Sequence, residues 1–114
     1  MRTHELKERT RRFAIEVLKL GECIPKTLPG KAVASQMIRA ATSVGANYRA
    51  ACRARSRAEF ISKIGIVEEE ADETAFWLEI VSDSGLLNTL AVDQLHQEAD
   101  ELTRIMVASG RTAK

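Results

Sequence analysis

The sequence contains few of the residues that interrupt regular secondary structure. Of its 114 residues only two are proline and six are glycine, whereas 16 are alanine. Alanine has the highest helix propensity, and a turn-rich β fold would need more glycine and proline than this. The composition therefore favours long helices, and the length is typical of one domain spanning residues 1–114.

Cysteine and long apolar runs are equally scarce. The two cysteines, Cys23 and Cys52, match no metal-binding spacing and need not pair. No apolar run approaches the ~20 residues that span a bilayer. The first five residues lack the apolar stretch of a signal peptide. We therefore expect a cytoplasmic protein in a reducing compartment, with no membrane partner.

Motifs for catalysis and cofactor binding are absent as well. The sequence holds no glycine-rich phosphate loop and no dinucleotide fingerprint. A di-metal site in a helical bundle would need two Glu-x-x-His motifs, and the nearest imitation, at 93–96, places His96 beside the core stripe rather than in it. We expect no metal, no cofactor and no enzymatic activity. An enzyme that uses the Cys52 thiol is the weakest alternative.

Charge is separated along the chain. Residues 1–57 contain 13 Lys/Arg and four Asp/Glu, and residues 58–114 contain four Lys/Arg and 12 Asp/Glu, although the net charge is only +1. A chain polarised in this way can pair its own halves, pair with copies of itself, or bind an anionic partner.

Apolar residues recur at spacings of three and four in four segments, which indicates amphipathic helices. We expect these helices at about 3–24, 31–55, 57–82 and 89–108, with a linker at 24–30, Thr3 as the first N-cap and a frayed tail at 110–114. Ser56 and Glu59 have the capping-box spacing, and Gly85 suits a left-handed helix exit. Because the connections are short, the sequence predicts an all-α, antiparallel up-down-up-down four-helix bundle.

A row of arginines is the candidate nucleic-acid-binding surface. On a helical wheel Arg39, Arg49, Arg53 and Arg57 fall within about 80°, and Arg55 lies off the row near the helix end. Guanidinium groups bind phosphates bidentately, so RNA or DNA is a candidate partner. Tyr48 is the only aromatic residue nearby, which gives little support to base stacking. Alternatively, the arginines pair with the acidic helices.

The third predicted helix is apolar on two sides. Besides its core stripe it carries a second cluster, which we assign as a candidate oligomer interface: Ile66, Phe76, Trp77 and Ile80. An aromatic-rich second face on a soluble helix usually marks a subunit interface. The alternatives are that this helix is central in the bundle or that adjacent helices wrap around Trp77.

Several motifs in the middle of the chain resemble one known family. They are SVGANYRAA at 43–51, RARS at 53–56, EFISKI at 59–64, EEEADET at 68–74 and WLE at 77–79. In this order they resemble the four-helix-bundle proteins first noticed in intervening sequences of bacterial 23S rRNA genes. Ala50 departs from the glutamate that the family usually has after the Asn-Tyr-Arg stretch.

The resemblance implies a cytoplasmic bacterial four-helix bundle assembled as a ring-like homopentamer. More distantly, the chain is similar to the accessory variability proteins of diversity-generating retroelements, which are basic pentamers with nucleic acid and a reverse transcriptase as implied partners. We therefore expect a non-enzymatic homo-oligomer that binds nucleic acid, RNA in particular, or assists a nucleic-acid enzyme. The alternative is an oligomeric protein-interaction scaffold that binds no nucleic acid.

Overall fold

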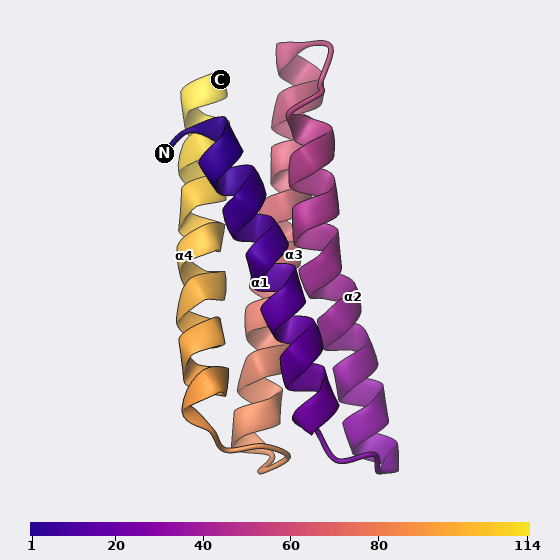
Figure 1. The fold of residues 1–114 in the computed structure, drawn as a ribbon. Coiled ribbons are helices and arrows are strands. Elements are labelled where there is room, and N and C mark those ends of the chain that lie inside the picture. Colours follow the sequence, from indigo (N-terminus) through magenta and orange to yellow (C-terminus); the bar gives the residue numbers. More distant parts are fainter.

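The computed structural model describes all 114 residues as four helices joined by three short connections. The helices are α1 (Thr3–Cys23), α2 (Leu28–Ala51), α3 (Arg57–Asp83) and α4 (Leu90–Ala113). They run alternately up and down a molecule of 44 × 21 × 19 Å (Figure 1). Each helix contacts its neighbour in sequence, and α1 also meets α4, as expected for the predicted all-α up-down bundle. None of the four combines the length and apolarity needed to cross a membrane.

Side-chain caps fix the beginnings of two helices. The Thr27 hydroxyl accepts a hydrogen bond from the Gly30 backbone N–H (3.2 Å) at the start of α2. At the start of α3 the Ser56 hydroxyl accepts from the Glu59 N–H (3.0 Å), as predicted. The Glu59 carboxylate reaches back one residue further than in a standard capping box, to the N–H of Arg55 (3.3 Å).

Some helix boundaries differ from the prediction. α2 begins at Leu28, inside the predicted linker, because Pro29 occupies the first turn, where no backbone donor is needed. The same helix ends at Ala51, four residues earlier than predicted. α1 begins at Thr3 itself, so Thr3 is not its N-cap. The segment predicted to fray is helical, because α4 continues to Ala113. Gly85 does adopt the left-handed conformation, with φ of 80°.

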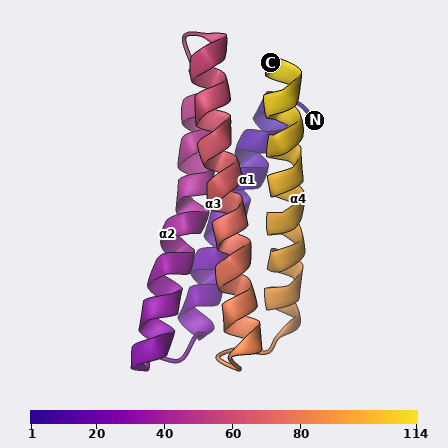
Figure 2. The same cartoon turned by 180° about the vertical axis from the view of Figure 1, so that it is seen from behind.

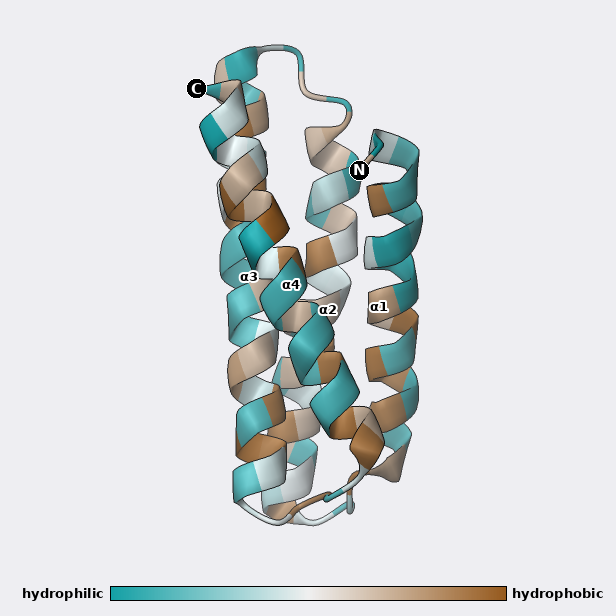
Figure 3. Ribbon diagram, turned by 90° about the vertical axis from the view of Figure 1, so that its left-hand side faces the viewer, coloured by the Kyte–Doolittle hydropathy of each residue, from teal (hydrophilic) through white to brown (hydrophobic).

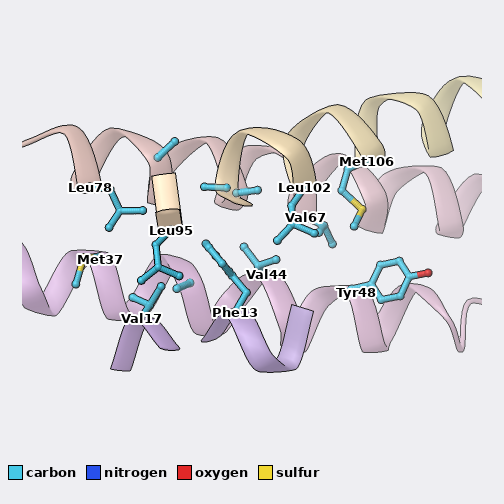
Figure 4. Close-up of a cluster of buried hydrophobic side chains, with 14 of the residues drawn as sticks. Phe13, Val17, Met37, Val44, Tyr48, Val67, Leu78, Leu95, Leu102 and Met106 are labelled. Carbon is cyan, nitrogen blue, oxygen red and sulfur yellow. The ribbon is translucent and has the colours of Figure 1, made fainter. Parts of the chain in front are cut away.

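The core is a single cluster of 21 buried apolar residues drawn from all four helices and the α1–α2 connection. Phe13, Val44 and Leu102 lie near its middle (Figure 4), and the hydrophobic residues of α1 face the other helices (Figure 3). The contributions of α2 include the small residues Ala41 and Ala51. A Cβ placed on Gly45 would lie 3.4 Å from the Thr10 carbonyl oxygen, so the small face brings α1 close to α2.

The helices are not packed equally. α3 packs extensively against both α2 and α4 and lies between them (Figure 2), whereas the backbones of α1 and α3 do not approach closely and the two helices stand diagonally opposite. α1 packs along α2 but meets α4 over far less of its length. The two helices lean apart toward the chain termini (Figure 3). α1 is therefore the least secured element of the bundle.

Candidate nucleic-acid interface

The bundle topology converts the separation of charge along the sequence into a separation along the molecule. The α2–α3 turn and both termini lie at the same end (Figure 1). The helix halves nearest that end, residues 1–12, 41–69 and 102–114, contain 13 Lys/Arg and five Asp/Glu. The other half contains four Lys/Arg and 11 Asp/Glu. We call these halves the basic end and the acidic end.

Four of the five candidate arginines gather at the basic end. Arg49 lies in the last turn of α2, Arg53 and Arg55 lie in the α2–α3 turn, and Arg57 is the first residue of α3. All four are exposed, and none makes an ion pair within 4 Å. The predicted row on one continuous helix is wrong, because α2 ends at Ala51. The arginines instead surround a turn.

Arg39 is separated from the other four. Its guanidinium donates to the Glu70 carboxylate (2.9 Å) and also pairs with Glu73, both on α3. Hydrogen bonds to Glu70 and then Glu73 raise the pKa of Arg39 above its usual value. The charge of Arg39 is therefore neutralised within the bundle, as in the alternative that the arginines pair with the acidic helices.

Two further cations join the basic end from α1. Lys7 and Arg11 line a groove of about 670 Å³ between α1 and α2, opposite Arg49. The groove exists because Gly45 and Ala46 of α2 contribute almost no side chain to it. Only the packing of α1 on α2 brings these cations to Arg49, so the sequence contained no direct signal for them.

Cys52 and His96, the residues considered for catalysis and metal binding, lie toward opposite ends of the bundle. No group of three or more His, Cys, Asp or Glu side chains is placed to hold a metal ion. His96 lies at the acidic end, where its Nε2 is 2.8 Å from the Glu79 carboxylate. Cys52 follows the last residue of α2, is half-buried and has a free thiol.

Tyr48, the single tyrosine, is buried at the basic end with only 4% of its surface exposed. Burial, reinforced by the neighbouring Cys52 thiol, raises the pKa of Tyr48 to about 12. Because the unfolded value is about 10, this contribution to stability is complete below pH 10 and is lost as the pH rises through 12. We expect tyrosinate absorbance to appear near pH 12 in the native protein and near pH 10 in denaturant. Equal titration midpoints in the native and the denatured protein would mean that the Tyr48 hydroxyl is solvated.

The second apolar cluster of α3 is partly covered. Phe76 is 50% exposed and Ile66 36%, and Ile80 is half-buried. Trp77 packs against the core instead, and its ring meets Phe76 edge to face with centroids 5.0 Å apart. Its indole N–H donates to the Glu73 carboxylate (3.3 Å). The exposed part of the cluster is therefore Ile66 and Phe76, with the half-buried Ile80 beside them.

Comparisons with known proteins extend the motif resemblance to the whole chain. The model of the 23S rRNA-intervening sequence protein family matches residues 2–108. A crystal structure of a protein of unknown function from the S23 ribosomal protein family of Bacteroides thetaiotaomicron VPI-5482 is 27% identical, with a TM-score of 0.88 over 97% of this chain and 99% of that one. No curated protein matches significantly. The chain is a member of the 23S rRNA-intervening sequence protein family.

Proposed function

We propose that this protein is a non-enzymatic, cytoplasmic nucleic-acid-binding protein whose basic end contacts the phosphate backbone, of RNA in particular. The observation that carries the proposal is the group of four exposed arginines without ion pairs around the α2–α3 turn: Arg49, Arg53, Arg55 and Arg57. Guanidinium groups match phosphate oxygens in planar, bidentate geometry. Lys7 and Arg11 extend the same surface along α1.

The composition of the surface indicates what it would recognise. No exposed aromatic ring lies among these cations, since Tyr48 is buried, so stacking on unpaired bases has no platform. Contacts to phosphates position a protein but carry no base information. We therefore expect binding that depends weakly on sequence and strongly on salt.

We further propose that the protein acts as a ring-like homo-oligomer. The exposed Ile66 and Phe76, with the half-buried Ile80, support subunit contacts, and the family resemblance implies a homopentamer. Several basic ends on one particle would raise the affinity for a polyanion beyond that of a single subunit, because each later contact becomes intramolecular.

The test is a titration of labelled single-stranded RNA and duplex DNA at two salt concentrations. The variant R49Q/R53Q/R57Q should bind about 30- to 100-fold more weakly at low salt, and its log–log salt slope should be shallower by about 2–3. The matched control is K26Q/K31Q, which removes two cations from the acidic end. It is compared with R49Q/R53Q, which has the same net charge, and should bind like the wild type.

A protein-interaction scaffold without nucleic-acid binding is the second candidate. It is favoured by Arg39, which shows that α3 can neutralise an arginine of α2. The two candidates differ in one result. If the wild type binds neither RNA nor DNA at the lower salt concentration, the nucleic-acid proposal is wrong and the scaffold remains.

A further inference from the structure

A groove of about 630 Å³ lies between α1 and α4. Its floor is apolar and is formed by Phe13, Leu20 and Leu95, each at most 5% exposed. Arg9 lines it near the middle of the bundle, where its guanidinium pairs with Glu98 (2.6 Å) and Glu101 (2.9 Å) of α4. The remaining charged groups of its rim are Arg12, Glu16 and Lys19. An apolar floor between charged rims is the usual form of a site for a protruding apolar side chain.

The outer face of α3 has the complementary shape. Ile66, Glu69, Glu73, Phe76 and Ile80 follow one another at spacings of three and four, so they form one strip along the helix. Phe76 protrudes from it, and the edge-to-face contact with the part-buried Trp77 holds its ring. No basic residue occurs on α3 after Lys63. The strip is thus apolar and acidic.

We propose that the outer face of α3 in one copy of this chain packs into the α1–α4 groove of the next copy. This inference rests on the proposed homo-oligomer and identifies its two contact surfaces. Phe76 and Ile80 would enter the groove, while Glu69 and Asp72 would approach Arg12 and Lys19. Lys19 has no ion-pair partner within its own subunit, and Arg12 has only Glu8 at 3.8 Å.

Charge favours this head-to-tail contact over a symmetric one. Two α3 faces packed on each other would oppose like carboxylates, which costs free energy. Two grooves facing each other would leave both apolar floors without a protruding partner. A heterologous contact avoids both problems, and such contacts give rings when the rotation closes.

The positions of the two surfaces determine the relative orientation of neighbouring copies. Phe76 and Ile80 and the apolar floor of the groove all lie in the acidic half of the bundle. α1 and α3 stand diagonally opposite in the bundle, so one copy can hold a neighbour on each side. Copies joined in this way stand side by side and point in the same direction. All basic ends then lie on the same face of the ring, where several of them can contact one polyanion, as the proposed function requires.

The test uses two variants that each lose one surface. F76E removes the protruding ring, and R12E/K19E reverses the rim of the groove; all three side chains are exposed, so both proteins should keep their helicity. By sedimentation the wild type should be larger than the 12.6 kDa monomer. Each variant alone should be monomeric, with a dissociation constant raised about tenfold or more. An equimolar mixture should form two-subunit particles and nothing larger, since only one intact contact remains.

Three results would overturn the inference. They are a monomeric wild type at high concentration, two variants that fail to associate with each other, or loss of assembly in the matched control K26E/K31E. This control makes the same charge change at exposed positions outside the groove.

Nucleic-acid binding is measured separately with F76E, whose arginines are intact. If F76E is monomeric and still binds RNA with a shallower salt slope, both proposals stand; if the wild type assembles but binds no RNA, only the proposed function fails.

Discussion

Gly30→Ala should destabilise the protein by about 3 kcal/mol, a large loss for a substitution that adds only one methyl group. Gly30 is buried in the first turn of α2, and a Cβ there would overlap the backbone carbonyl oxygen of Pro25. Because that oxygen is a backbone atom, the overlap cannot be relieved by rotating a side chain. The α1–α2 connection would have to move, and the hydrogen bond from the Gly30 N–H to Thr27 would be lost with it.

The matched control is Gly65→Ala, for which we expect the opposite sign. Gly65 lies inside α3, and a Cβ on it would meet nothing within 4 Å. Alanine there should stabilise the helix by up to about 1 kcal/mol. Urea unfolding of both variants measures the difference, with unchanged m-values as the condition for comparing midpoints. Equal effects at the two positions would contradict the packing described for Gly30.

Phe13→Ala should cost about 3–5 kcal/mol, because it removes a large side chain from the middle of the core. Phe13 is 2% exposed and lies beside Val44 (Figure 4). Since α1 meets α4 over only a short length, this ring provides much of what holds α1 to the bundle. We therefore expect amide protons of α1 to exchange faster relative to those of α3 in the variant.

Leu18→Ala provides the control on the same helix. Leu18 is 43% exposed, so its truncation should cost less than about 1 kcal/mol. Both changes shorten an apolar side chain of α1 and differ mainly in burial. A loss below about 1.5 kcal/mol for Phe13→Ala would mean that α1 is held chiefly by something other than its apolar face.

The sequence predicted the fold well because local signals agreed with one another. The spacing of apolar residues in four segments, the pair Ser56 and Glu59, and Gly85 each have a local physical cause, and each was found in place. The errors arose where one residue type has two uses. Pro25 follows the end of α1, whereas Pro29 belongs to the first turn of α2, and only the Thr27 cap distinguishes them.

The candidate surface was less predictable because it depends on distances between helices. A helical wheel placed Arg39 and Arg49 in one row, yet Arg39 reaches Glu70 and Glu73 on the neighbouring helix. Lys7 was not considered, because nothing in the sequence shows that it faces Arg49 across α1 and α2. These relations follow from the order in which the helices surround the core.

The two ends of the bundle also make the molecule a long electric dipole. Its charges are sorted along an axis of 44 Å, several times the Debye length of about 8–10 Å at physiological salt. A polyanion approaching in solution attracts one pole and repels the other, so the protein turns before it touches. Productive encounters then become a larger share of all collisions, and association should slow as salt shortens the reach of the field.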